Sequence, residues 1–199
     1  GVSHDLRTPL TRMRLALSML DDEDRIPLER DVDDMQRMID AFLNFAKGES
    51  EGEPEPTDAI ELTRTVVEDA QRAGQPVSLA EATGEGTVIL RRLAMRRALD
   101  NLVSNAVRYG RHAEVSVHLT EKSLRFRVED DGPGIPEELH AQAQRAFTRL
   151  DPSRNQDHGS GVGLGLAIAT DIARAHGGVL RLGRSEKLGG LRADIVIAR

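Results

Sequence analysis

The run Gly159-Ser160-Gly161-Val162-Gly163-Leu164-Gly165-Leu166-Ala167-Ile168 places alternating glycines directly before a helix expected over residues 162–176. Backbone N–H groups in such a loop, with the N-terminus of the following helix, can bind phosphate. The run lacks the Gly-Lys-Ser/Thr of a P-loop. A dinucleotide-binding fingerprint requires a strand immediately before the glycines, and none is expected here. Taken alone, it fits a phosphate-binding loop and a flexible hinge equally well.

A helix expected over residues 92–109 carries side chains that suit a nucleotide. Asn101 and Asn105 are four residues apart and share one face of that helix. Asn carbonyl oxygens suit Mg²⁺, which takes few protein ligands and keeps waters and substrate phosphates. Arg108 would lie close enough to neutralise phosphate charge. The alternative for this segment is a solvated helix face.

The segment Val128-Glu129-Asp130-Asp131-Gly132-Pro133-Gly134-Ile135 predicts a strand that runs into a turn. Gly132 and Gly134 permit close backbone approach and positive φ. A buried carboxylate at the end of a strand, here Asp130, can accept a hydrogen bond from an exocyclic amine such as that of adenine. An ordinary Asp-Gly turn is the alternative.

The chain opens on an apolar helix that carries the run Ser3–Leu10. His4 is a candidate nucleophile because the unperturbed pKa of imidazole is about 6.5. Asp5 beside it is a candidate base, the alternative being a first-turn carboxylate favoured by the helix dipole. Thr8 lies one turn after His4 on the same face. Pro9 removes a backbone hydrogen bond and predicts a bend.

Apolar residues recur every three or four positions from Val2 to Leu20 and again from Leu28 to Ala46. This seam predicts two helices, with Pro27 in the first turn of the second. A short connection makes them antiparallel neighbours. Because two helices cannot bury a continuous apolar stripe alone, we expect two hairpins to pair into a dimeric four-helix bundle.

The acidic, Gly- and Pro-rich segment 48–56 predicts a linker. Thr57 or Asp58 is expected to N-cap a helix that reaches about Ala73. The further elements expected are a short helix at 137–145 and strands at 77–82, 87–90, 113–120, 124–130, 178–184 and 191–198. The strands at 113–120 and 124–130 are expected to pair as a hairpin. This order predicts an α+β sandwich with helices on one face of a sheet.

Composition narrows the function classes. The chain has 199 residues, is 39% hydrophobic and 30% charged, and has a net charge of -6, which gives no reason to expect nucleic-acid binding. The absence of cysteine excludes disulfides and thiolate metal sites. No apolar stretch approaches the roughly 20 residues that span a bilayer. Because the chain starts without Met, we expect it to be a fragment whose upstream part carries a membrane anchor.

Five motifs in chain order resemble the catalytic core of bacterial sensor histidine kinases of two-component systems, especially osmosensor kinases of the EnvZ type. HDLRTPL resembles the H box, NLVSNAVRYG the N box and EDDGPGIP the first glycine box. Ala146-Phe147-Thr148-Arg149 resembles the F box, and GSGVGLGLAIA the second glycine box. The resemblance covers nearly the whole chain.

The resemblance implies a dimerisation and histidine phosphotransfer domain at 1–47, a linker at 48–56, and a catalytic ATP-binding domain of the Bergerat fold at 57–199. That fold is shared with gyrase, chaperone and mismatch-repair ATPases. His4 would accept the γ-phosphoryl group of ATP, with Asp5 as the general base. The group would then pass to an aspartate of a response-regulator receiver domain.

The resemblance also implies a phosphatase activity, in which Thr8 orients water toward the phosphorylated regulator. It implies ATP and Mg²⁺ as cofactors, with Asn105 as the principal Mg²⁺ ligand, Asn101 assisting, and Asp130 bound to the adenine amine. Gly132 and Gly134 would let the base approach. The further implied nucleotide contacts are Arg108, Tyr109, Phe147, Arg149, Gly161, Gly163, Gly165 and Leu166.

The expected assembly is a homodimer that forms the cytoplasmic part of an inner-membrane sensor. Two alternatives remain: an ATP-hydrolysing chaperone or topoisomerase-like module, and a non-enzymatic dimeric adaptor with a decayed nucleotide site. The first would not need His4 and Asp5, and the intact Asn105 and Asp130 argue against the second. The remaining histidines lack metal-ligand spacing and are expected to be surface or packing residues: His112, His118, His140, His158 and His176.

Overall fold

The computed structural model describes residues 2–46, 52–148 and 163–199. The chain divides into two compact units, Gly1–Ser50 and Glu51–Arg199. The first unit contains α1 (Val2–Leu17) and α2 (Asp22–Ala46). The second contains β1 (Glu55–Asp58), α3 (Ala59–Arg72), β2 (Val77–Thr83), β3 (Thr87–Leu90), α4 (Arg92–Tyr109), β4 (Ala113–Leu119), β5 (Ser123–Asp130), η2 (Glu137–Leu139), α5 (His140–Ala143), α6 (Gly165–Ala175), β6 (Val179–Arg184) and β7 (Leu191–Ala198).

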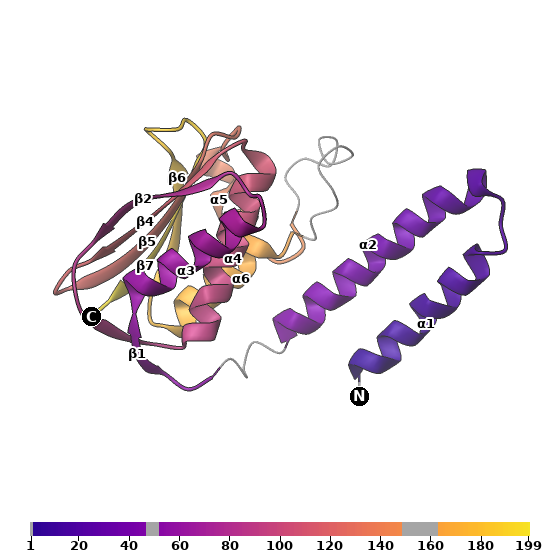
Figure 1. The fold of residues 1–199 in the computed structure, drawn as a ribbon, viewed down its shortest axis with the longest axis horizontal. Helices are drawn as coiled ribbons and strands as arrows, with labels where there is room; N and C mark the ends of the chain where they lie inside the picture. Colours follow the sequence, from indigo (N-terminus) through magenta and orange to yellow (C-terminus); the bar gives the residue numbers. More distant parts are fainter. Residues whose placement is uncertain (1, 47–51, 149–162) are drawn as a thin grey trace. The chain divides into compact units, whose positions relative to one another are not determined.

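The first unit is the predicted antiparallel helical hairpin (Figure 1). Leu10 and Val32 are buried, and an ion pair joins Arg14 to Asp33. Much of the predicted apolar seam is uncovered in the single chain. Among the side chains of this unit that the structure describes, the exposed large apolar ones are Met13, Leu15, Met19, Leu20, Ile26, Leu28 and Met35.

The second helix starts earlier than predicted. Pro27 was expected in its first turn, but α2 begins at Asp22 and holds Pro27 in its interior. The acidic run joins the helix because Asp22, Glu23 and Asp24 occupy the first turn, where negative charge favours the helix dipole. The turn before it is closed by Arg25 N–H, which donates to Asp21 O at 2.9 Å.

The second unit is built on a five-stranded sheet in the order β2-β4-β5-β7-β6. β2 and β4 are parallel, and every other neighbouring pair in this sheet is antiparallel, including the predicted hairpin of β4 and β5. The helices α3, α4 and α6 lie on one face of the sheet (Figure 1). The predicted α+β class, with helices on one face of a sheet, is therefore confirmed.

Alternation along the strands creates the core. In β5, the side chains of Leu124, Phe126, Val128 and Asp130 are buried, and those between them are half-buried. Helix α4 packs against β5, while α3 packs against β2 and β4 and α6 against β6 and β7. Asp130 ends the buried row of β5 as its polar member. The sheet thus delivers one carboxylate to the edge of an aliphatic core.

The predicted cap of α3 is confirmed at Asp58, whose Oδ1 accepts hydrogen bonds from the N–H groups of Ile60 and Glu61 at 2.9 and 3.0 Å. β1, immediately before it, was not predicted and begins inside the expected linker. It pairs antiparallel with β3 in a separate two-stranded sheet, with Pro56 opposite Ile89. In the described parts of the chain, no helix is both long and apolar enough to cross a bilayer.

Candidate functional site

The C-terminal half of α4 brings the predicted amide and cationic side chains to one end of the second unit. Asn101 is half-buried, and its Nδ2 donates to Arg97 O at 2.8 Å. One turn on, the half-buried Asn105 lies against the first residue of α6, Gly165. A Cβ at Gly165 would stand 3.0 Å from Asn105 Nδ2 and 3.1 Å from its Oδ1. The structure therefore brings together the asparagine helix and the end of the glycine loop.

Arg108 and Tyr109 follow on the last turn of α4. The guanidinium of Arg108 lies 5.8 Å from the centre of the Tyr109 ring, and the Tyr109 side chain is exposed. Among the described residues, Arg108 Nε and one of its terminal nitrogens are buried and have no hydrogen-bond partner. Buried cationic donors without partners are costly unless an anion meets them. This side chain is thus suited to a phosphate.

Asp130 is 3% exposed and is held by backbone donors. Its Oδ1 accepts hydrogen bonds from Gly132 N–H at 2.9 Å and Leu191 N–H at 3.0 Å. Burial raises the pKa of Asp130, the two backbone bonds lower it, and neighbouring Asp131 raises it. The backbone donors fix the Asp130 carboxyl group in place. The net shift of its pKa is upward. The ionised group accepts hydrogen bonds, and the protonated group can also donate one.

Glycines leave space around this carboxylate. A Cβ at Gly132 would come within 2.7 Å of Tyr109 O, and one at Gly190 within 2.3 Å of Asp130 Oδ1. Gly134 has a φ of +72° and lies next to Gly190 O. The Asp-Gly turn therefore packs against the end of α4 on one side and the turn between β6 and β7 on the other.

A backbone hydrogen bond joins Phe147, near the end of one described range, to Gly163, the first residue of the next. Phe147 N–H donates to Gly163 O at 3.0 Å, and both residues have positive φ, 61° and 71°. A Cβ at Gly163 would strike Thr148 O at 2.6 Å, so glycine is required there. Phe147 is exposed, and Leu166 is half-buried in the first turn of α6. The predicted contacts Arg149 and Gly161 lie outside the described residues.

The predicted phosphoacceptor region lies in the other unit. His4 and Asp5 are in α1, but their side chains lie outside what the structure describes. Thr8 is half-buried, and Pro9 is accommodated inside the helix. In the described ranges, no group of three or more His, Cys, Asp or Glu side chains could hold a metal ion.

Sequence reasoning missed the contribution of the turn between β6 and β7. Gly190 N–H donates to Asp130 O at 3.0 Å, and Leu191 N–H donates to the Asp130 carboxylate. The pair Gly189-Gly190 was the available signal, because adjacent glycines mark turns with close approach. It also missed Asp131, whose Oδ1 accepts from Arg111 N–H at 2.6 Å and His112 N–H at 2.9 Å.

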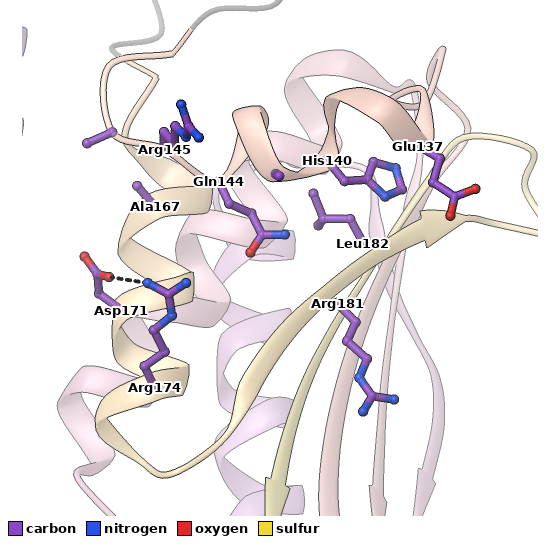
Figure 2. Close-up of a pocket in the computed structure, with 11 residues that line it drawn as sticks. Glu137, His140, Gln144, Arg145, Ala167, Asp171, Arg174, Arg181 and Leu182 are labelled. Atoms are coloured by element: carbon purple, nitrogen blue, oxygen red, sulfur yellow. Dashed lines mark ion pairs between the residues drawn. The ribbon is translucent and has the colours of Figure 1, made fainter.

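A cavity of about 850 Å³ lies between α5, α6 and β6 (Figure 2). Its lining includes Glu137, His140, Gln144, Asp171, Arg174 and Arg181. An ion pair of 3.9 Å joins Arg174 to Asp171. Among the residues that the structure describes, none of those predicted to bind nucleotide lines this cavity.

Two known families match the chain, one over its N-terminal part and one over its C-terminal part. Residues 90–198 match the family described as histidine kinase-, DNA gyrase B- and HSP90-like ATPase. Residues 1–51 match the His kinase A phosphoacceptor domain. The first match contains the predicted nucleotide residues, and the second contains His4, Asp5 and Thr8.

Curated relatives are similar over essentially the whole chain. The sensor histidine kinase GtrS of Pseudomonas aeruginosa is 34% identical over 203 residues, which cover 100% of this chain and 41% of GtrS. The sensor protein RstB of Escherichia coli is 37% identical over 207 residues, covering 96% of this chain and 46% of RstB. The chain thus spans less than half the length of these relatives.

Solved structures agree in fold. The NMR structure of the histidine kinase domain of the E. coli osmosensor EnvZ has a TM-score of 0.55 and 34% identity, and the match covers 74% of this chain and 91% of that domain. Full-length ShkA, crystallised with AMPPNP, has a TM-score of 0.70 and 24% identity over 98% of this chain and 43% of ShkA. At that identity the likeness to ShkA concerns the fold alone.

Proposed function

Because this chain belongs to the sensor histidine kinases, we propose that it is an ATP-dependent kinase that phosphorylates its own His4. The phosphoryl group then passes to an aspartate of a response-regulator receiver domain. The observation that carries the proposal is that the C-terminal half of α4 meets the start of α6 at Asn105 and Gly165, and meets the Asp130 turn at Tyr109 and Gly132. It is supported by a phosphoacceptor-family match over residues 1–51 of the same chain.

The base of ATP is proposed to bind at Asp130. Its carboxylate is oriented by Gly132 and Leu191 N–H, so one oxygen is occupied and the other is left to accept from an exocyclic amine. The absence of side chains at Gly132 and Gly134 allows the flat base to approach the backbone. Tyr109, exposed at the end of α4, is proposed to contact the base.

The phosphates are proposed to lie between Arg108 and the start of α6. Arg108 offers buried donors that the described residues leave without partners, and the N-terminus of α6 favours anions. Mg²⁺ enters with ATP, and the Asn105 amide oxygen suits it as a ligand, with Asn101 one turn away. Phosphates and waters complete its coordination. The remaining proposed contacts are Phe147, Arg149, Gly161, Gly163 and Leu166.

In the transfer step an imidazole nitrogen of His4 attacks the γ-phosphorus of ATP. A nitrogen–phosphorus bond forms, the bond to the β-γ bridging oxygen breaks, and ADP leaves with that oxygen. Asp5, adjacent in α1, is proposed to take the imidazole proton. Positioning and charge neutralisation supply most of the catalysis in such transfers.

The hairpin unit is proposed to form the dimer and to take part both in phosphorylation and in dephosphorylation of the regulator. Its exposed apolar side chains, including Met13, Leu20, Leu28 and Met35, would be covered by a second copy in a four-helix bundle. Thr8, one turn after His4, is proposed to orient the water that dephosphorylates the regulator. Residues 1–47, 48–56 and 57–199 are the proposed functional divisions. The whole protein is proposed to be membrane-anchored, with this part in the cytoplasm.

Incubation with γ-labelled ATP and Mg²⁺, followed by a panel of receiver domains, tests the proposal. Label should first appear on the protein and then move to at least one receiver. Rapid release of free phosphate with no protein-bound label would instead favour the ATP-hydrolysing alternative.

A further inference from the structure

His176 joins the two helices that form the candidate nucleotide site. Its Nε2 accepts a hydrogen bond from Arg91 N–H at 3.0 Å, and its Nδ1 lies 2.7 Å from Ile172 O. Because a carbonyl only accepts and a backbone N–H only donates, these two bonds require the neutral imidazole with its proton on Nδ1. Each ring nitrogen thus has one definite partner.

The bond to Arg91 caps α4 from outside the helix. Arg91 is the N-cap residue of α4, and no side chain forms a capping hydrogen bond there within α4. His176 is the C-cap residue of α6. The His176 imidazole therefore connects the C-cap of α6 to the N-cap of α4.

The opposite ends of the same two helices meet at the site. There, Gly165 at the start of α6 lies against the Asn105 amide near the end of α4. The two antiparallel helices are thus in contact at both ends. A hydrogen bond joins His176 to Arg91 at one end, and Gly165 lies close to Asn105 at the other.

The two helices pack against each other, and both carry buried small side chains. Buried alanines recur on both, among them Ala94, Ala98 and Ala106 in α4 and Ala169 and Ala173 in α6. A slide by one residue would move Gly165 by about 1.5 Å, which the tight contact with Asn105 cannot absorb unchanged.

We propose that His176 is a positioning residue that sets the axial register of α6 against α4, and so the position of Gly165 at Asn105. The inference rests on the proposed ATP-binding function. The fold around His176 supports the placement: Gly177 N–H and Gly178 N–H close the end of α6 on Arg174 O and Ala173 O at 2.9 Å each. Gly178 also lies where a Cβ would strike Val196 O at 2.3 Å, which holds this corner against β7.

Two amide substitutions separate the two bonds of the ring. His176→Gln places an acceptor where Nε2 stands and keeps the bond to Arg91 N–H. His176→Asn places a donor where Nδ1–H stands and keeps only the bond to Ile172 O. His118→Asn is the matched control, because the 2.9 Å hydrogen bond between His118 Nδ1 and Thr83 Oγ1 joins β4 to β2 and involves neither α4 nor α6.

Amide hydrogen exchange at Arg91, the side-chain amide resonances of Asn105 without nucleotide, and the Kd for Mg-ATP are measured in each variant. His176→Asn should lose protection at Arg91, shift the Asn105 resonances and raise the Kd roughly fivefold, the worth of one hydrogen bond. His176→Gln and His118→Asn should stay within about twofold of the starting protein in Kd.

Equal Kd values for the Gln and Asn variants, or unchanged Asn105 resonances after loss of Arg91 protection, would overturn the positioning role. Failure of the unaltered protein to bind ATP would refute the proposed function instead. The Asn105 resonances would still report the helix register in that case, because they are recorded without nucleotide.

Discussion

The amide of Asn105 and the backbone of Gly165 are in such close contact that a single methyl group at residue 165 would lie 3.0 Å from Asn105 Nδ2. The two residues are brought together by α4 and α6, which pack along their length. This contact connects the proposed Mg²⁺ ligand to the end of the glycine loop, and it makes the size of residue 165 critical.

Gly165→Ala should weaken Mg-ATP binding while leaving the protein folded. The added methyl group displaces the Asn105 side chain by a few tenths of an ångström, and we expect roughly a tenfold rise in Kd, the equivalent of 1.4 kcal/mol. Calorimetry measures the affinity, and thermal unfolding checks the fold. In an Asn105→Ala background the same substitution should have little further effect on affinity, so two independent, additive losses would contradict the coupling.

Arg108→Gln should reduce ATP affinity and flatten its dependence on salt. The substitution removes a buried charge proposed to face phosphate, and a loss of roughly tenfold is expected for a charged hydrogen bond. Arg111→Gln is the matched control, because the Arg111 side chain is 96% exposed. Calorimetry at two salt concentrations makes the comparison, and equal losses for the two variants would rule out a specific phosphate contact.

Asp130→Asn and Asp131→Asn should change stability in opposite directions at pH 7. Burial raises the pKa of Asp130, so its ionisation in the folded state costs stability as pH rises above the ordinary carboxyl range. Asn removes that charge and can still accept both backbone bonds at Oδ1. The Asp130→Asn protein should therefore be more stable at pH 7, yet bind ATP more weakly.

Backbone N–H groups of His112 and Arg111 hold the pKa of Asp131 below its usual range. Its ionised form thus contributes stability above the unfolded-state pKa, and that stability is lost as pH falls through the folded-state pKa. Asp131→Asn should be less stable at pH 7. Urea unfolding should show the Asp130→Asn difference shrinking as pH falls from 7 towards about pH 4, and the Asp131→Asn difference shrinking only below about pH 4. Loss of stability in Asp130→Asn at pH 7 would contradict the account of Asp130.

Thr8→Ala should separate the two activities proposed for α1. Autophosphorylation should persist, because the hydroxyl takes no part in the attack of His4 on ATP. Dephosphorylation of a phosphorylated receiver should slow roughly a hundredfold, the loss expected when a reacting group is no longer positioned. Thr11→Ala, with its hydroxyl on the following turn, is the control. Phosphatase rates that match between Thr8→Ala and the starting protein would remove this role.

Local signals predicted most of the fold. The helix expected at 92–109 and the strands at 87–90 and 191–198 have the bounds that the structure shows, because capping, alternation and turn residues are encoded within each segment. β1 was not predicted, because it has four residues, includes a proline and is defined by its pairing with β3. The start of α2 was misplaced because Pro27 was read as a first-turn signal.

The candidate site was predictable where one segment carried the whole pattern. Asn101 and Asn105 share a helix face, and Asp130 ends a strand before two glycines. The backbone donors at Gly190 and Leu191 and the bond from Arg91 to His176 join residues far apart in sequence. No local pattern reports such contacts, and so His176 was expected only to pack.

The central claim is that His4 receives the γ-phosphoryl group of ATP. Its most direct test is mass-spectrometric mapping of the protein after incubation with Mg-ATP under neutral conditions, beside His4→Gln. The account predicts a phosphate on His4 that acid removes and alkali does not, and no phosphate on the His4→Gln protein, which should still bind ATP. An acid-stable phosphate, or label that persists when His4 is replaced, would contradict it.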